Sequence, residues 1–227
     1  MTRRARSPTG WKRRRRPARS SRSPPPWPGK SAARSFQTRA RQLGLQVETL
    51  ELSTPSNALS APGLAQLARR IEQEKPALIF AALDSPQAVQ LRSAVGTELP
   101  IYGTSQINPF TLNRDNPNDK LPELDGVRLI DIPWQLQPDN VAVARYPRPA
   151  GNDNERPNPD LARLYALGID AYRIAHEIAL QRSGFDIDGV TGRLNVNMIG
   201  GGATYFQRQE TQAVFQNGLP VPTADQY

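Results

Sequence analysis

The fold is decided at residues 77–86, ALIFAALDSP. The seven consecutive apolar residues from Ala77 to Leu83 are strand-sized, and far fewer than the roughly 18 that a membrane-spanning helix needs. Successive side chains of a strand point to opposite faces. A run without polar positions therefore predicts a strand covered on both sides, as in a parallel sheet between helices. Ser85 can cap a following helix that has Pro86 at its first position.

Helical and extended segments alternate on both sides of this strand. Apolar residues recur at helical spacing before Gly44, and a second helix begins at Pro62. Residues 45–52 and 100–104 are strand candidates. The resulting α-β-α-β-α-β order, with short connections, predicts an α/β fold in which a parallel sheet has helices on both faces.

The second half of the chain has clear elements separated by Asn- and Pro-rich loops. The expected elements are a strand at 126–132, one or two helices after Asn158 that are continuous or interrupted at Gly168, and a β-hairpin formed by residues 191–196 and 203–209 around glycines 200–202.

The excess of basic over acidic residues is confined to the N-terminal part of the chain. The formal net charge is +8, yet residues 1–41 hold 14 Lys and Arg and no acidic residue. The rest, with 15 basic and 21 acidic residues, carries −6. Residues 1–30 are rich in Arg, Pro and Ser, which predicts a disordered tail ahead of an α/β domain over residues 31–227. The run at 12–16 could bind phosphate groups, but the acidic body argues against a nucleic-acid partner.

The composition excludes several kinds of reactive site. Without cysteine there is no disulfide, thiolate nucleophile or cysteine-ligated zinc, and the single histidine, His176, has no second histidine with which to share a metal. No carboxylate pair, catalytic triad or metal cluster emerges from the sequence. It therefore predicts neither an enzyme nor a bound cofactor.

Polar residues at the ends of the predicted strands are the first candidate binding residues. Ligands meet a parallel sheet at the carboxyl ends of its strands, where Asp84, Ser85, Thr104 and Ser105 lie. These residues also have a structural interpretation, since Ser85 suits a helix cap.

Asp131 and Trp134 are the remaining candidates, at the end of the predicted strand 126–132. Asp131 could line a cleft between two lobes, or it could cap a turn. Trp134 could anchor an interface, or it could lie in the core or at a hinge.

Residues 31–219 resemble the LppC/LpoA family of outer-membrane lipoproteins. The segments that carry the resemblance are ALIFAALDSPQAVQLR (77–92), LPIYGTSQI (99–107), LDGVRLIDIPWQL (124–136), LYALGIDAYRIA (164–175), GVTGRL (189–194) and FQNG (215–218). The resemblance implies a type I periplasmic-binding-protein-like fold, here the second lobe and the closing elements with the first lobe incomplete. An incomplete lobe would expose sheet edges and apolar surface.

The resemblance also implies a function. Family members bind and activate a class A penicillin-binding protein, so we expect a non-enzymatic regulator of peptidoglycan synthesis, with peptidoglycan as a further ligand. The alternative is one lobe of a periplasmic receptor for small molecules of the amino-acid type, which has the same fold. The family is anchored to the outer membrane, on its periplasmic side, by a lipid. This chain has neither a signal-peptide pattern nor a lipidation cysteine, and we expect its Arg/Pro-rich residues 1–28 to be a mistranslated or misannotated start.

Overall fold

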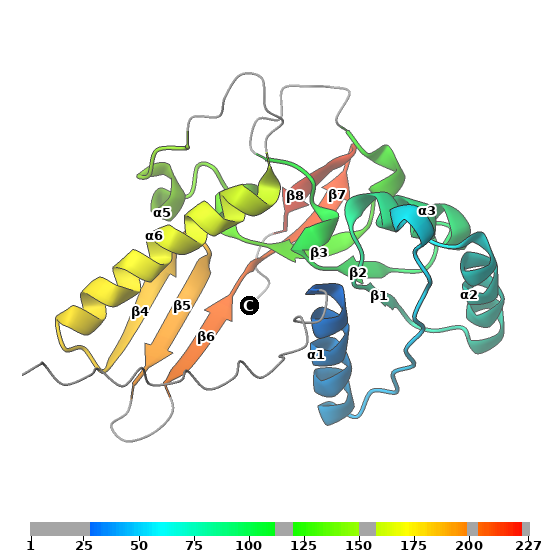
Figure 1. Ribbon diagram of the computed structural model, residues 1–227, viewed down its shortest axis with the longest axis horizontal. Helices are drawn as coiled ribbons and strands as arrows, with labels where there is room; N and C mark the ends of the chain where they lie inside the picture. The colour runs from blue at the N-terminus through cyan, green and yellow to red at the C-terminus, as the bar shows by residue number, and fades with distance from the viewer. Residues whose placement is uncertain (1–27, 112–119, 150–157, 199–203, 224–227) are drawn as a thin grey trace, which may run out of the picture.

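The computed structural model describes residues 28–111, 120–149, 158–198 and 204–223, in which helices pack around two β-sheets (Figure 1). The helices are α1 (Pro28–Gln42), α2 (Ala61–Glu74), α3 (Ser85–Val95), α4 (Pro133–Leu136), α5 (Val141–Ala144) and α6 (Pro159–Ala179), with 3-10 turns η1 (Pro55–Asn57), η2 (Ser105–Ile107) and η4 (Pro122–Leu124). The strands are β1 (Ile79–Ala81), β2 (Ile101–Gly103), β3 (Arg128–Asp131), β4 (Gly184–Gly189), β5 (Gly192–Asn197), β6 (Tyr205–Gln209), β7 (Thr211–Gln216) and β8 (Leu219–Pro222). The expected tail, residues 1–30, lies outside the described residues except for its last three, which begin α1.

The larger sheet is parallel in its first half and antiparallel in its second. Its strand order is β1-β2-β3-β7-β8, in which β1, β2 and β3 run parallel while β7 and β8 alternate in direction. The three parallel strands lie inside the segments predicted at 77–83, 100–104 and 126–132, although each is shorter than its prediction. The expected α/β fold is confirmed.

Helices cover both faces of β1, but the cover is uneven across the sheet. Ala81 points to one side, where it joins Leu91 of α3 in the main hydrophobic core. Phe80 points to the other side, where its ring stacks on Phe36 of α1 with the ring centroids 4.2 Å apart. On this second side the cover ends before β3, where Ile130 is 44% exposed. The unbroken apolar run therefore predicted the two-sided cover of its own strand correctly.

The strand expected at residues 45–52 does not form. The segment pairs with no strand: the backbone N–H of Leu45 donates to the Ala40 carbonyl at 3.0 Å, and side chains make further contacts. Gln37 of α1 donates to Thr49 over 3.0 Å, and Arg70 of α2 forms an ion pair with Glu48. Leu45 is exposed, so its alternation with polar neighbours does not mark a buried face. A strand needs a hydrogen-bonded neighbour, and the local pattern carries no information about one.

The first turn of α3 differs from the expectation in one residue. Asp84, not Ser85, is the N-cap: its carboxylate accepts from the backbone N–H of Gln87 at 3.0 Å. The Gln87 side chain accepts in return from the backbone N–H of Asp84 at 3.4 Å. A carboxylate is favoured here because it also faces the positive end of the helix dipole.

The smaller sheet is antiparallel, and α6 crosses one of its faces (Figure 1). The two strands of the predicted hairpin pair as β5 and β6, while β4 is a third strand that the prediction missed. Helix α6 runs without a break at Gly168, and Asn158 caps it as expected. Asp170 of α6 holds the β4–β5 turn by accepting from the backbone N–H groups of Val190 (3.1 Å) and Thr191 (2.7 Å) and from the Thr191 hydroxyl (2.7 Å).

The FQNG segment (215–218) contains the two turn residues between β7 and β8. Asn217 and Gly218 both have positive φ, 53° and 76°, which is the backbone of a two-residue type I′ hairpin turn. At Gly218 an added Cβ would lie 2.7 Å from the backbone nitrogen of Leu121, so only glycine fits.

Candidate functional site

The candidate residues at strand ends gather at one edge of the larger sheet. Asp84, Thr104 and Asp131 come at or just after the ends of β1, β2 and β3. Because these strands run parallel, their carboxyl ends meet at the same edge. Ser85 and Ser105 follow Asp84 and Thr104 in the chain and lie at this edge as well.

Asp131 is fully buried at the centre of a polar cluster. Its carboxylate accepts two hydrogen bonds from the guanidinium of Arg163 on α6, at 3.1 Å from Nε and 2.7 Å from Nη2. The Asn108 side chain and the backbone N–H of Ile132 donate to the same carboxylate, each at 2.8 Å. Arg163 also donates to the carbonyl groups of Ser105 and Asn108, at 2.8 and 3.1 Å. The cluster therefore ties α6 to the ends of β2 and β3.

Burial and charge act against each other on the ionisable groups of this cluster. Burial lowers the pKa of Arg163, but the hydrogen bond and the charge of Asp131 outweigh this effect and leave that pKa raised. Glu210 is the single residue between β6 and β7, and burial raises its pKa. Arg208 opposes the rise and Asp131 adds to it. The region thus favours a charged arginine and disfavours a second charged carboxylate.

The other polar candidates stabilise the loops to which they belong. Asp84 caps α3 and also accepts from the Asn57 side chain at 3.4 Å. Ser85 is buried in the first turn of α3. Thr104 caps η2 by accepting from a backbone N–H at 3.4 Å, and Ser105 provides the carbonyl that Arg163 binds. Asp84, Thr104 and Ser105 remain partly exposed.

Trp134 lies in the core. It is fully buried and packs with Ala166 of α6 in the second hydrophobic cluster. The ring of Tyr165 is 5.5 Å from the Trp134 ring and tilted by 46°, and the guanidinium carbon of Arg148 lies 3.6 Å from the ring centre. Partial burial lowers the pKa of Arg148 to about 10, so the side chain stays charged at neutral pH. The Trp134 ring therefore lies inside the fold and is not exposed at the surface.

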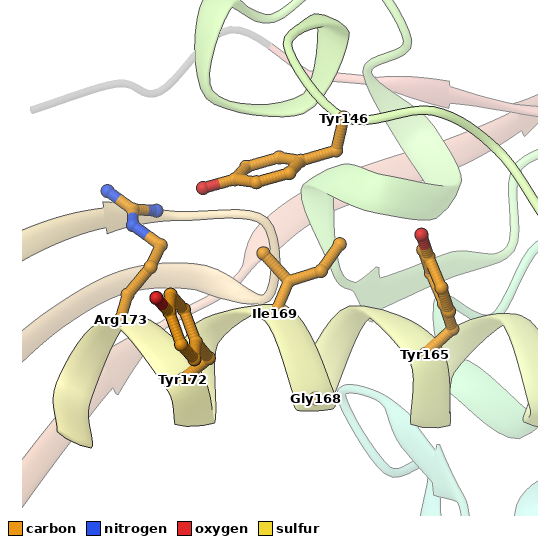
Figure 2. Close-up of a pocket in the computed structure, with 6 residues that line it drawn as sticks. All are labelled: Tyr146, Tyr165, Gly168, Ile169, Tyr172 and Arg173. Atoms are coloured by element: carbon orange, nitrogen blue, oxygen red, sulfur yellow. The ribbon is translucent and has the colours of Figure 1, made fainter. Parts of the chain in front are cut away.

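A hollow of about 430 Å³ opens on α6 (Figure 2). It is lined by Tyr146, Tyr165, Gly168, Ile169, Tyr172 and Arg173. Figure 2 shows Tyr146 lying across from Ile169, with its hydroxyl pointing toward Arg173. Arg173 also donates to the carbonyl of Asp188 at 2.7 Å, which holds its side chain in place. Such an aromatic, largely apolar lining suits contact with another polypeptide better than binding of a strongly charged small molecule.

The described residues contain no group of three or more His, Asp and Glu side chains that could hold a metal ion. His176 is exposed on α6, with Nδ1 3.8 Å from a carboxylate oxygen of Glu177. Within the same described ranges, no helix has both the length and the apolar character needed to cross a membrane.

The partners of these residues are not predicted by local sequence spacing. Arg163 and Asp170 are charged residues on a helix with mostly apolar neighbours, which is a signal for a buried partner. The identity of each partner depends on tertiary structure and could not be obtained from local spacing. Tyr165 and Tyr172 are seven residues apart, a spacing that places them on one face of a helix and could have indicated the hollow.

In sequence, the chain is similar to the penicillin-binding protein activator LpoA of Mannheimia succiniciproducens. The two are 27% identical over 154 residues, which cover 66% of this chain and 25% of the relative. The chain therefore spans about a quarter of the length of this relative.

Two solved structures have a similar fold. One, described as a "putative branched-chain amino acid ABC transporter" from Chromobacterium violaceum, is 35% identical with a TM-score of 0.62, over 83% of this chain and 56% of that chain. The other is the C-domain of LpoA from Haemophilus influenzae, described as a regulator of PBP1A, with a TM-score of 0.59 at 19% identity over 86% of this chain and 57% of that one. The second likeness concerns the fold alone. Residues 30–218 match the family described as "LppC putative lipoprotein", and the chain belongs to this family.

Proposed function

We propose that this chain is part of a non-enzymatic regulator that binds a class A penicillin-binding protein and activates peptidoglycan synthesis. The observation that carries the proposal is the family match over residues 30–218, together with a relative named as a penicillin-binding protein activator. The description of a similarly folded C-domain as a regulator of PBP1A supports the same class of partner. Such a regulator would work in the periplasm at the outer membrane, with peptidoglycan as a second ligand.

The contacts of the strand-end residues support binding rather than catalysis. Asp131 receives hydrogen bonds from three residues, and Asp84 and Thr104 cap helical turns. Catalysis by such groups would require a nucleophile or base that is free to reach a substrate. A regulator needs no reactive group, because it acts by binding one conformation of its partner more tightly than another.

We place the contact with the synthase at the carboxyl edge of the larger sheet. Asp84, Thr104 and Ser105 are partly exposed there and would touch the partner. The other three candidates are buried and would hold the edge in shape. In this proposal the edge is a protein-binding surface, and its polar residues provide orientation rather than chemistry.

A glycan polymerisation assay tests the function. The full chain is added to a purified class A penicillin-binding protein with its lipid-linked precursor, and glycan length and rate are followed while binding is measured by biolayer interferometry. We expect binding and a faster rate. Sedimentation with purified sacculi measures the second ligand separately. An unchanged rate and no binding at saturating concentrations would refute the proposal.

Ser105→Arg and Ser93→Arg form a matched pair for the contact edge. Both replace a serine that is at least partly exposed, but Ser105 lies at the proposed edge and Ser93 lies on α3. We expect Ser105→Arg to weaken synthase binding by about tenfold, near 1.4 kcal/mol, and Ser93→Arg to leave it unchanged. Thermal melting checks that both variants fold. Equal binding by the two variants would refute this contact edge.

A second candidate function is one lobe of a small-molecule receptor. The 35% identity with the Chromobacterium violaceum protein, described as part of an amino-acid transporter, favours it. Titration calorimetry with leucine, isoleucine and valine separates the candidates. A receptor would bind one of them with a Kd of about 1 μM or tighter, close to −8 kcal/mol, whereas the regulator would give no binding heat.

A further inference from the structure

The hollow on α6 has aromatic walls and an open floor. Figure 2 shows Tyr165 and Tyr172 rising from the helix on either side of Ile169, with Tyr146 lying across from it. The Tyr172 side chain is 75% exposed, so packing in the fold does not use its ring. An added Cβ at Gly168 would meet nothing within 4 Å, so the described side chains leave the floor open between the two helix tyrosines.

Polar groups lie together at one end of the hollow. Arg173 uses Nη1 to donate to the Asp188 carbonyl and to Asp170, at 2.7 and 3.4 Å. Its Nε and Nη2 donate to no described residue, and Figure 2 shows the Tyr146 hydroxyl pointing toward this guanidinium. Arg173 is also the only charged residue among the six that line the hollow. This end therefore offers a ligand N–H donors and a positive charge.

The spacing of the two helix tyrosines suits a ligand built from repeated rings. Tyr165 and Tyr172 are seven residues apart, which is about 10 Å along a helix and close to the length of one disaccharide in an extended glycan. The C–H face of a sugar ring packs on an aromatic ring, while its hydroxyl and amide groups need polar partners at the edge. A polypeptide would need a suitable apolar side chain at each tyrosine, whereas a glycan presents a ring at every step.

We propose that the hollow binds the glycan strand of peptidoglycan, with a disaccharide against the tyrosines and a carboxylate of the attached peptide stem at Arg173. This inference rests on the proposed function, because it names the site for the second ligand of that function. The lining disfavours a strongly charged ligand, and the sugar backbone between the stems is uncharged. A regulator held on the strand in this way stays at a high local concentration beside the synthase that extends it.

Titration calorimetry of the full chain tests the ligand class. The probes are short peptidoglycan strands that carry their peptide stems, an uncharged N-acetylglucosamine tetramer, and the free stem peptide. We expect the stem-bearing strand to bind about tenfold more tightly than the tetramer, and the free peptide to give no binding heat. In about 1 M salt, where charges are screened beyond roughly 3 Å, the advantage of the stem should disappear. No binding of either glycan, or equally tight binding of the free peptide, would overturn the proposal.

Gly168→Leu tests the site by filling the hollow. The new side chain enters open space, and replacing a glycine inside a helix favours the helical conformation. Ala179→Leu, at an exposed alanine of the same helix outside the hollow, is the matched control. We expect Gly168→Leu to weaken glycan binding at least about tenfold and Ala179→Leu to leave it unchanged, with neither variant lowering the Tm. Equal glycan binding by the two variants would overturn the proposal.

Tyr172 gives a second pair that separates ring stacking from hydrogen bonding. Because its side chain is mostly exposed, Tyr172→Ala should fold normally but weaken glycan binding about tenfold. Tyr172→Phe keeps the ring and should bind within about twofold of the wild type. Wild-type binding by Tyr172→Ala would show that the ring does not hold the glycan, and would overturn the proposal.

Synthase binding, measured without glycan, distinguishes this inference from the proposed function. We expect Gly168→Leu and Tyr172→Ala to bind the synthase as tightly as the wild type. A wild type that binds the synthase but no glycan refutes this inference alone, and one that binds neither refutes both. Variants that lose synthase binding but keep glycan binding would show that the hollow is a polypeptide site, and would overturn the proposal.

Discussion

Asp131→Asn measures how much the polar cluster contributes to stability. The substitution keeps the shape of the side chain but removes the charge that Arg163 binds through two hydrogen bonds in a fully buried place. Breaking a buried ion pair costs about 3–5 kcal/mol. Arg163 keeps the carbonyl groups of Ser105 and Asn108 as acceptors, so we expect the lower end, about 3 kcal/mol. For a chain of this size that corresponds to a Tm lower by roughly 6–12 °C.

The assay is thermal and guanidinium unfolding, and Asp160→Asn is the control. Asp160 binds the same arginine at 3.0 Å, but its side chain is 69% exposed, so its loss should cost no more than about 1 kcal/mol. The double variant Asp131→Asn/Arg163→Met should recover part of the loss, because it leaves no unpaired buried charge. Equal destabilisation by Asp131→Asn and Asp160→Asn would refute the central role of the pair.

Three further predictions concern single side chains. Asp170→Asn should lower the free energy of unfolding by about 2 kcal/mol in chemical unfolding, because one of its two acceptor oxygens at the β4–β5 turn becomes a donor. If Asp170→Asn costs no more than substitution of the exposed Asp186 by Asn, Asp170 does not stabilise this turn. Asp84→Ala should cost about 1 kcal/mol through loss of the α3 cap, and the loss of amide hydrogen-exchange protection should be confined to the first turn of α3. If Ser85→Ala shows this local loss instead, Ser85 is the cap. Glu210→Gln should raise stability at pH 7, because burial raises the pKa of Glu210 and makes its charged form unfavourable in the fold. As the pH falls below that raised pKa the difference in Tm should shrink, and it should vanish below the ordinary pKa of a glutamate, where the side chain is protonated in both the folded and the unfolded chain. A difference independent of pH would show that Glu210 does not titrate in this way.

An element could be predicted from the sequence where the residues that determine it all lie in one short segment. The apolar run before Asp84 predicted β1 and the helices on both of its faces, because consecutive apolar residues place apolar side chains on both faces of a strand. The cap at Asn158 and the proline after it predicted the start of α6 for the same reason. The identity of the α3 cap was wrong by one residue, since Asp84 and Ser85 are both good caps and only the backbone geometry distinguishes them.

The remaining features depend on neighbours that are distant in sequence. Residues 45–52 have the composition of a strand but form none, because no strand lies beside them to share hydrogen bonds. Strands β7 and β8 have no marked alternation, and β7 is stabilised by pairing with β3. The strand-end candidates were placed at the correct edge, yet the arginine that binds Asp131 comes from a helix 32 residues later and had no local signal that identified it as the partner.

The pairing of β3 with β7 has a consequence for biosynthesis. Asp131 lies opposite Thr211, eighty residues further along the chain, so β3 cannot pair with β7 until the residues between them have been synthesised. Until then the second edge of β3 carries unpaired backbone groups, which are prone to wrong pairing with other nascent chains. Contacts between such distant residues also slow folding, because a long loop must close before they can form. The β3 edge therefore stays open to wrong pairing from the time it is synthesised until β7 is available to cover it.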